Sequence, residues 1–317
     1  MNGLAPSGPV AGRRVVNALT IDVEDYFQVS AFAPFIARDE WDARECRVER
    51  NIDLILQLTA AHDIRATFFI LGWIAERYPA MVRRIVDAGH EVASHGYGHY
   101  RATDQGEQRF LEDIVRAKGI LEDLAGVKVH GYRAPSFSIG ERTPWAFECL
   151  AKAGYGYSSS IYPIRHDHYG TPDAPRFAHR TDSGVLEIPV ATVRRWGRNW
   201  PAGGGGYFRL LPYRVSRALL RRVNQRDGLP AVFYMHPWEL DPAQPRIPGL
   251  NARTRFRHYV NLRRTERRLA RLLADFSWGR MDAVFLQGGA GDGSMGIAKA
   301  EFMTVPSSSA RQPCSIT

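Results

Sequence analysis

The alternation of short apolar runs with segments of helical periodicity most constrains the fold of this chain. Each run is rich in β-branched or aromatic residues and is bounded by polar residues or glycine, as in VVNALTID at 15–22. Such runs are typical of buried strands. The predicted strands are 15–22, 64–70, 91–94, 129–133, 157–161, 186–190 and 231–235.

Helical spacing fills the gaps between these runs. One predicted helix carries apolar residues from Val48 to Thr59, a second carries them from Leu111 to Leu124 before the stop at Gly126, and a third follows Pro212. Strands that alternate with helices indicate parallel pairing with covered faces. The predicted fold class is α/β, and seven strand candidates favour a barrel over an open sheet by a small margin.

Composition excludes several classes of protein. With 317 residues, 44% hydrophobic and 24% charged, the chain can bury an ordinary core, which excludes global disorder, collagen and coiled coil. Cys46, Cys149 and Cys314 are widely spaced, which argues against a disulfide framework or a structural zinc site and favours a reducing compartment. No signal-peptide or membrane-spanning pattern is evident, so we expect a cytoplasmic location.

The basic charge is concentrated near the C-terminus. The net charge is +9, and the segment 253–271 holds eight arginines with Glu266 as its only acid. Leucines such as Leu262, Leu269 and Leu273 give the segment an apolar face, which predicts one amphipathic basic helix packed on the domain. A solvated face is favoured over contact with a polyanion or with an anionic membrane surface, and no specific nucleic-acid module is evident.

Polar residues fall at the ends of the predicted strands. Asp22 and Glu24 end the first strand, His95 follows the third, Arg133 ends the fourth and His236 follows the last. In parallel barrels and in open α/β sheets, chemistry collects at the carboxyl ends of strands. We therefore expect these side chains to converge.

The segment SHGYGH at 94–99 places His95 and His99 four residues apart. On a helical turn or a tight loop this spacing brings both rings to one side, which suits a divalent metal. The zinc-protease pattern requires glutamate after the first histidine, where this chain has Gly96, so that class is excluded.

The acidic segment that follows the first strand supplies a carboxylate for such a site. Strand alternation directs Asp22 and Glu24 to one face. The alternative interpretation of this acidic segment is a solvated strand end, or a helix N-cap at Asp25. Two imidazoles and one carboxylate make a three-ligand site with an open position for water. A buried Arg133 needs a carboxylate partner, and Asp22 is available. His236 is either a candidate general acid or a core residue whose hydrogen bonds are satisfied.

Five segments together resemble the polysaccharide deacetylases of carbohydrate esterase family four, the NodB-homology group. They are TIDVEDYFQVSAF at 20–32, SHGYGH at 94–99, GYRAPSFSI at 131–139, GGGYFRLLPY at 204–213 and HPWELDP at 236–242. Within that group the chain is similar to the subfamily of exopolysaccharide and PEP-CTERM/exosortase loci, whose members carry a C-terminal extension. The resemblance implies a distorted (β/α) barrel with fewer than eight complete units, plus a C-terminal helical extension.

The resemblance also implies roles for individual residues. Asp22 matches the general base, His95 and His99 the metal ligands, Arg133 the residue that positions the base, and His236 the general acid. The family often has adjacent aspartates after this strand, whereas this chain has Val23 next to Asp22. Strand alternation makes Glu24 the expected third ligand, and Asp25 is the alternative. Ser158 departs from the family, where an aspartate is usual, and this removes a charge near the cleft.

The function implied is metal-dependent hydrolysis of N-acetyl groups on a hexosamine-containing polysaccharide or oligosaccharide, in exopolysaccharide biosynthesis. The alternatives are an amidohydrolase for a small cyclic or ureido substrate and a catalytically weak carbohydrate-binding protein. Zinc is the expected metal, with cobalt, nickel or manganese as alternatives. The oligomeric state stays open, and peripheral contact with the inner membrane surface is a further option. The predicted organisation is a flexible N-terminus at 1–14, the barrel at 15–240, a basic helical extension at 241–286 and a disordered tail at 287–317.

Overall fold

A computed structural model describes residues 15–166 and 169–286. In this part of the chain, strands alternate with helices. The predicted tails at 1–14 and 287–317 lie outside the described residues. The strands are β1 (Val16–Val23), β2 (Thr67–Ile70), β3 (Glu91–Ser94), β4 (Gly131–Tyr132), β5 (Tyr157–Ser158), β6 (His179–Arg180), β7 (Leu186–Glu187), β8 (Thr192–Arg195), β9 (Arg198–Pro201), β10 (Val232–Met235) and β11 (Ser277–Gly279). The α-helices are α1 (Val48–Ala61), α2 (Gly72–Arg77), α3 (Pro79–Asp87), α4 (Glu107–Ala125), α5 (Ala146–Lys152), α6 (Gly205–Leu210), α7 (Tyr213–Arg222), α8 (Ala252–Tyr259), α9 (Leu262–Asp275) and α10 (Met281–Phe285). Short 3-10 helices are η1 (Tyr26–Gln28), η2 (Ser30–Phe32), η3 (Arg38–Ala43), η4 (Ala102–Asp104), η5 (Pro135–Phe137) and η7 (Pro237–Leu240), and η6 (Val223–Asp227) is a π-helical turn.

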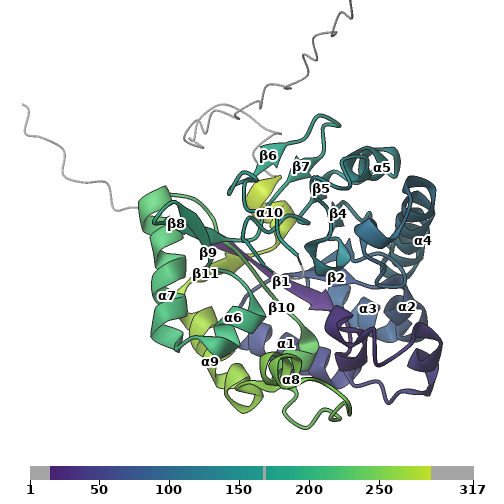
Figure 1. Cartoon of the computed structure of the whole chain (residues 1–317), viewed down its shortest axis with the longest axis horizontal. Coiled ribbons are helices and arrows are strands. Elements are labelled where there is room, and N and C mark those ends of the chain that lie inside the picture. The colour runs from purple at the N-terminus through teal and green to yellow at the C-terminus, as the bar shows by residue number, and fades with distance from the viewer. Residues whose placement is uncertain (1–14, 167–168, 287–317) are drawn as a thin grey trace, which may run out of the picture.

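One curved sheet organises these elements, with β1 running through the middle of the molecule (Figure 1). The strand order is β10-β1-β2-β3-β4-β5-β7-β6, and β11 also pairs with β1. Every pair in this sheet is parallel except β6 with β7. All seven predicted runs contribute a strand, although those at 129–133, 157–161 and 186–190 keep only two paired residues each. β6, β11 and the β8–β9 hairpin were not predicted.

Beyond the short strands, isolated backbone hydrogen bonds continue the curvature of the sheet. Ile188 N donates to Ser158 O at 2.8 Å, and Ala191 N then donates to Val232 O of β10 at 3.2 Å. The segment after β7 therefore reaches back to the opposite edge of the sheet. Within the described residues the structure is a distorted (β/α) barrel with fewer than eight complete units, as the resemblance implies.

Helices cover the outside of the barrel, with α2 to α5 on the right and α6, α7 and α9 on the left of Figure 1. The predicted helices are present, because α1 buries Val48, Ile52, Ile55 and Thr59, α4 ends at the left-handed Gly126 (φ 65°), and α7 follows Pro212. Val115 of α4 and Val215 of α7 are apolar but exposed.

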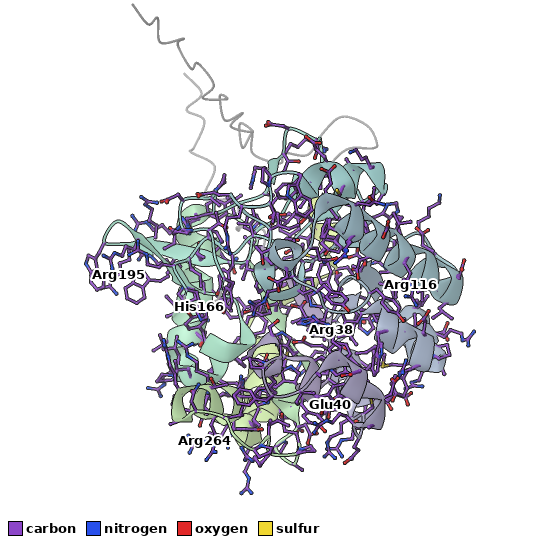
Figure 2. All side chains as sticks on the ribbon, turned by 45° about the vertical axis from the view of Figure 1, so that its right-hand side comes forward. Arg38, Glu40, Arg116, His166, Arg195 and Arg264 are labelled. Atoms are coloured by element: carbon purple, nitrogen blue, oxygen red, sulfur yellow. The ribbon has the colours of Figure 1, made fainter. Side chains whose placement is uncertain are left out.

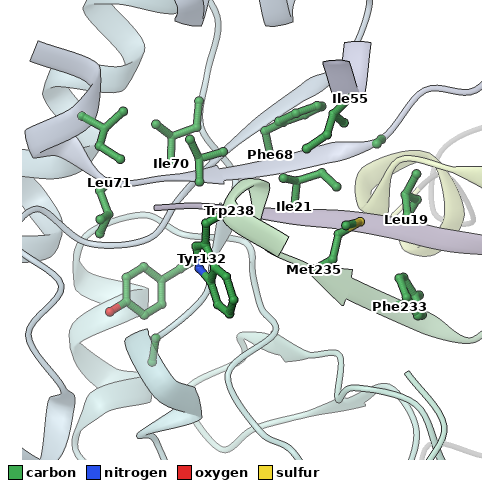
Figure 3. Close-up of a cluster of buried hydrophobic side chains, with 14 of the residues drawn as sticks. Leu19, Ile21, Ile55, Phe68, Ile70, Leu71, Tyr132, Phe233, Met235 and Trp238 are labelled. Carbon is green, nitrogen blue, oxygen red and sulfur yellow. The ribbon is translucent and has the colours of Figure 1, made fainter. Parts of the chain in front are cut away.

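The core lies between the sheet and these helices (Figure 3). Ile21 of β1, Phe68 of β2 and Met235 of β10 are buried on the outer face of the sheet, where α1 contributes Ile55. Because side chains alternate along a strand, Thr20 and Asp22, which flank Ile21 on β1, point into the barrel. The outer face provides hydrophobic stability, and the inner face is available for polar chemistry.

Helix α10 closes the barrel at the amino ends of the strands. Met281 is fully buried against Phe69 and Tyr157, and its N–H donates to Thr67 Oγ1 at 2.7 Å. Glu91 is buried beside it, where its carboxylate accepts bonds from Thr67 Oγ1 at 2.5 Å, from Tyr157 OH at 2.8 Å and from the N–H of Asp282 at 3.1 Å. This plug leaves the opposite, carboxyl end of the strands as the place for a site.

The arginine-rich segment forms two helices, where the sequence predicted one. α8 ends at Tyr259, Val260 is extended, and Asn261 is left-handed with φ 55° before α9 begins. The break is stabilised by Arg209 of α6, whose Nη1 donates to the carbonyls of His258 and Val260 at 2.6 and 3.1 Å. The predicted amphipathic packing is present, because the α9 leucines are buried while Arg264 points outward (Figure 2). Among the described helices, none is long and apolar enough to cross a bilayer.

Glu91 predicts a pH dependence of stability. Burial raises the pKa of Glu91 from 4.5 to about 7, with Asp282 adding to the effect. The folded state therefore holds a proton that the unfolded state releases, and the free energy of unfolding falls as pH rises between these values. We expect Glu91→Gln to flatten this part of the stability profile, measured by urea unfolding from pH 4.5 to 7.5. An unchanged slope in the variant would contradict the assignment to Glu91.

Candidate active site

Three buried side chains meet at the carboxyl ends of the strands on either side of β2. Glu24 follows β1, and His95 and His99 follow β3. One ligand atom from each lies within 4.8 Å of the others, and the residues are 3%, 2% and 5% exposed. One carboxylate and two imidazoles are donors that zinc and other first-row divalent metals accept. The structure brings these three predicted ligands together.

The two histidines are held by a tight loop, not by a helical turn. Gly96 and His99 both have positive φ, 75° and 54°, and a Cβ on Gly96 would lie 2.8 Å from the Asp113 carboxylate. That carboxylate, from α4, accepts the N–H of Tyr97 at 2.9 Å and the N–H of Gly98 at 3.4 Å. Helix α4 thus fixes the loop, and the two imidazole centroids lie 5.4 Å apart.

The hydrogen bonds around His95 define which ring nitrogen faces the cluster. His95 Nδ1 lies 2.8 Å from the carbonyl of Arg133, which can only accept, so Nδ1 carries the proton. Burial lowers the pKa of His95 to about 4, so the ring is neutral at physiological pH. Its Nε2 therefore presents a lone pair.

Glu24 has an oxygen that the chain itself leaves without a hydrogen bond. Its Oε2 is buried and lies 2.8 Å from His99 Nε2, yet the contact lacks hydrogen-bond geometry. A buried carboxylate oxygen without a donor is costly, and a cation shared by Glu24, His95 and His99 would satisfy it. Burial alone would raise the pKa of Glu24, but the neighbouring histidines lower it to about 2. The donor set therefore fits a divalent metal.

Asp25, the alternative ligand, has a different task. Its Oδ1 accepts the N–H of Tyr26 at 2.8 Å, and its Oδ2 accepts the N–H groups of Arg47 and Val48 at 2.5 and 2.9 Å. These are the first donors of η1 and α1, so Asp25 is the helix cap that the sequence analysis kept open. The strand alternation that favours Glu24 agrees with this placement.

Asp22 lies beside the three-ligand cluster and is held by Arg133. The guanidinium Nη1 is 2.6 Å from Asp22 Oδ1, and both side chains are almost inaccessible. The other bonds of Arg133 go to Thr20 Oγ1 and to the carbonyl and hydroxyl of Ser159. This confirms the pairing of Arg133 with Asp22, and it fixes the orientation of the Asp22 carboxylate that lines the cleft.

His236 reaches the cluster from the end of β10, the strand next to β1. Its Nε2 lies 3.1 Å from Glu24 Oε1, and its Nδ1 lies 2.9 Å from Glu239 Oε1. Glu239 is fully buried and forms an ion pair of 2.5 Å with Arg209 Nε. Burial would lower the pKa of His236, but the charges of Glu24 and Glu239 raise it to about 9. Burial would raise the pKa of Glu239, but the charges of Arg209 and His236 lower it to about 2.

Ser158 is buried on β5 and bonds to Ser160, whereas Arg133 bonds to the neighbouring Ser159. Its hydroxyl donates to Ser160 Oγ at 2.8 Å, and Ser160 Oγ accepts the N–H of Ala134 at 2.9 Å. A buried carboxylate is nevertheless close, because Glu187 is the register partner of Ser158 and accepts the N–H groups of Ser160 and Ile161. The serine hydroxyls therefore support the turn that carries Arg133.

Sequence reasoning missed Glu239 and Arg209, although both lie in the quoted motifs. The missed signal is the spacing of His236 and Glu239, three residues apart across a proline, which forms a capping box. A second signal is Gly205, where a Cβ would lie 2.0 Å from Glu239 Oε1. The absence of a side chain at Gly205 therefore makes room for this carboxylate.

An open cleft of about 370 Å³ contains these groups. Asp22, Glu24, His95, His99 and His236 all line it. Aromatic side chains, including Tyr207, Tyr234 and Trp238, line the same cleft. Predominantly apolar walls with a few converging polar groups are typical of ligand sites.

The buried pair of Arg209 and Glu239 predicts strong coupling in stability. Arg209→Met leaves Glu239 without its guanidinium partner, with only His236 opposite it, and removes two bonds to the α8–α9 junction, so we expect the free energy of unfolding to fall by about 3–5 kcal/mol. Arg209→Met/Glu239→Gln should lose less than the sum of the two single variants, because the lone charges disappear together. Urea unfolding of the four proteins measures this, and strict additivity would contradict the pairing.

Comparisons with known proteins give two adjoining family matches. The model described as "Polysaccharide deacetylase" matches residues 41–157, and that described as "Domain of unknown function (DUF3473)" matches residues 159–286. The first covers His95, His99 and Arg133, and the second covers His236 and Glu239. Since β7 and β10 lie in the same sheet as β1 to β5, the second region completes the barrel.

Individual relatives agree with the first match. A peptidoglycan-N-acetylglucosamine deacetylase of Bacillus cereus is 36% identical over 95 residues, which cover 30% of this chain and 34% of the relative. A peptidoglycan deacetylase of Helicobacter pylori is 31% identical over 113 residues, 36% of this chain and 38% of the relative. The chain thus spans about a third of the length of these relatives.

A solved structure shows the same fold over most of the chain. A crystal structure from Mycobacterium smegmatis, assigned as a polysaccharide deacetylase, aligns with a TM-score of 0.57 at 21% identity. The alignment covers 89% of this chain and 93% of that one. Residues 41–157 thus match the polysaccharide deacetylase family, and the likeness to this solved structure shows that the fold extends over most of the chain.

Proposed function

We propose that the chain is a metal-dependent deacetylase that hydrolyses N-acetyl groups on the hexosamine units of a polysaccharide. One observation carries the proposal: the Glu24, His95 and His99 ligand atoms lie within 4.8 Å of one another, with Asp22 and His236 beside them in one cleft. The curated relatives are named as deacetylases of peptidoglycan, which agrees with this chemistry.

Glu24, His95 and His99 would hold the metal, for which zinc is our proposal and cobalt, nickel or manganese are alternatives. A divalent cation in such a site supplies Lewis acidity, which makes a water molecule more acidic and polarises a carbonyl. The hydrogen bond from His95 Nδ1 to the Arg133 carbonyl keeps the imidazole in the tautomer that such a role needs.

Asp22 and His236 would move the protons. Asp22, held by Arg133 at 2.6 Å, accepts the proton of the attacking water at its carboxylate. His236, whose Nδ1 is held by Glu239 at 2.9 Å, gives the proton on Nε2 to the departing amine as the C–N bond breaks. The acetyl group leaves as acetate, and the sugar keeps a free amine. The base and the acid come from the carboxyl ends of two neighbouring strands, β1 and β10, so both can reach the same reacting group.

The shape of the cleft supports a polymeric substrate over a small ring. A second hollow of about 360 Å³ shares Arg101, Phe137 and Tyr169 with the first, so the two meet. A small cyclic or ureido compound would fill only a part of this space. We therefore propose an N-acetylated polysaccharide as substrate, with exopolysaccharide biosynthesis as the setting. Acetate release from N-acetylglucosamine oligomers, compared with ring opening of allantoin, tests the choice.

Removal of two ligands should abolish metal binding and turnover together. For His95→Ala/His99→Ala we expect the metal content to fall from about one ion per chain to near zero. Acetate release from chitohexaose should fall more than about 100-fold, since loss of a residue that only hydrogen-bonds to a metal ligand already costs about 10–100-fold. His130→Ala is the control, because His130 is an exposed histidine that does not line the cleft. Wild-type acetate release by the double variant would disprove the mechanism.

Asp22→Asn should separate chemistry from metal binding. The amide keeps the shape of the side chain but cannot accept a proton, so we expect acetate release to fall by about 10²–10⁴-fold. Metal affinity, measured by titration calorimetry, should stay close to that of the wild type, because Asp22 is outside the ligand cluster. If metal binding fails together with turnover in a folded variant, Asp22 is a ligand and not the base.

A further inference from the structure

The β8–β9 hairpin presents two exposed tryptophan side chains. Trp196 at its tip is 75% exposed, Trp200 on β9 is 47% exposed, and their ring centroids lie 6.4 Å apart. Arg195, the residue before Trp196, lies at the outer edge of the molecule (Figure 2). Clustered exposed aromatic side chains are typical of interaction surfaces, whereas single ones are common. The hairpin is therefore a projecting aromatic tip that a partner can cover.

The backbone at this tip is strained. The register pairs Arg195 with Arg198, so Trp196 and Gly197 form a two-residue loop. Both residues have positive φ, 51° and 71°, as in a type I′ turn, where asparagine, aspartate and glycine are preferred. A bulky residue in this region is an outlier, and the exposed ring of Trp196 gains little from packing. The strain indicates that the tryptophan has a role outside the folding of the chain.

The base of the hairpin is fixed to the barrel. Thr192 and Val193 are buried. Arg176 Nη2 donates to the carbonyl of Thr192 at 2.5 Å and also lies 2.8 Å from Asp227 Oδ2. On the other strand, Asn199 Nδ2 donates to the carbonyl of Pro172 at 3.2 Å. These contacts hold the tip in one orientation relative to the body of the protein.

The charge around the tip has one sign. Segment 192–201 contains no Asp or Glu, and it contains three arginines, Arg194, Arg195 and Arg198. All three are exposed, and none forms an ion pair with a carboxylate of the described residues. Arg195 lies over the Trp196 ring, 3.9 Å from its centroid. Helix α7, which packs against β8, adds two exposed arginines, Arg214 and Arg221. The surface is complementary to an anionic partner.

We propose that the β8–β9 hairpin docks the protein on an anionic lipid bilayer, with both tryptophans in the headgroup region and the arginines on lipid phosphates. Tryptophan favours the membrane interface, and basic residues are attracted to anionic lipids. A second copy of the chain would bring like charges together. A sugar chain needs walls around it, and no hairpin residue lines either hollow described above.

Docking at this hairpin would hold the catalytic cleft near the lipid surface. The chain passes from β9 through residues 202–204 directly into α6, and α6 lines the cleft with Gly206, Tyr207 and Arg209. The docking role belongs to the hairpin and not to the arginine-rich helices α8 and α9. It does not depend on the reaction at the cleft, because lipid binding is measured without a sugar substrate.

The test is co-sedimentation of the full chain with vesicles. One set contains phosphatidylcholine with about 30% phosphatidylglycerol, and the other contains phosphatidylcholine alone. We expect binding to the anionic vesicles to be about tenfold tighter or more near 50 mM salt, and to weaken near 300 mM salt, where charges are screened. Anionic vesicles with brominated acyl chains should quench part of the tryptophan fluorescence.

The decisive variant is Trp196→Asn, because Asn-Gly is a preferred type I′ turn and the hairpin stays folded. We expect its partition onto anionic vesicles to fall about fivefold or more, with less bromine quenching and with unchanged acetate release from soluble chitohexaose. Arg194→Gln/Arg198→Gln should lower the partition about tenfold. Its matched control, Arg263→Gln/Arg264→Gln, removes two exposed charges from α9 and should bind as the wild type does.

Several outcomes would overturn the proposal. Absence of binding to anionic vesicles, or wild-type binding by Trp196→Asn, would show that the hairpin is not a lipid contact. Equal losses in the α9 control and in the hairpin variant would show that only net charge matters. If Trp196→Asn instead abolishes a dimer seen by sedimentation velocity, or abolishes binding of alginate oligomers to a protein that ignores vesicles, the partner is a second copy or an anionic polysaccharide. Acetate release by the wild type tests the proposed function separately.

Discussion

The buried guanidinium of Arg133 is the group on which the rest of the site depends. It lies inside the barrel, pairs with Asp22 of β1 at 2.6 Å and bonds to Ser159 after β5. Its own backbone carbonyl accepts a hydrogen bond from His95 Nδ1. A buried charge is tolerated only when its partners are complete, so this residue forces β1, β4 and β5 into one arrangement. That arrangement orients both the proposed base and one proposed metal ligand.

The curl of the sheet adds the remaining parts of the site. Because β10 pairs with β1 in parallel, His236 after β10 lies beside Glu24 after β1, although 212 positions separate them along the chain. The two regions matched by different family models therefore share one barrel and one cleft. The stack from His236 through Trp238 to His258 continues this unit into α8. The C-terminal helices are in this sense part of the site.

Much of the barrel and of the site could be predicted from local patterns. Period-two alternation distinguished Glu24 from Asp25, and the segment 94–99 identified the histidine pair. The need of Arg133 for a counter-charge pointed to Asp22. These inferences succeeded because each depends on neighbours along one strand or loop, or on a general electrostatic requirement. The length of the paired segments was less predictable, since β4, β5 and β7 keep only two paired residues each where the chain crosses over the barrel.

What the sequence by itself determined was the identity of the strands, the residues at their carboxyl ends and the helix stop at Gly126, because these follow from side-chain alternation and from glycine's access to positive φ. The tertiary structure alone decided the pairing of Arg209 with Glu239, the break at Asn261 and the closure of the sheet by Ala191. Each of these joins groups that are distant along the chain, and a buried charge or an unpaired backbone group finds its partner only after the barrel has formed.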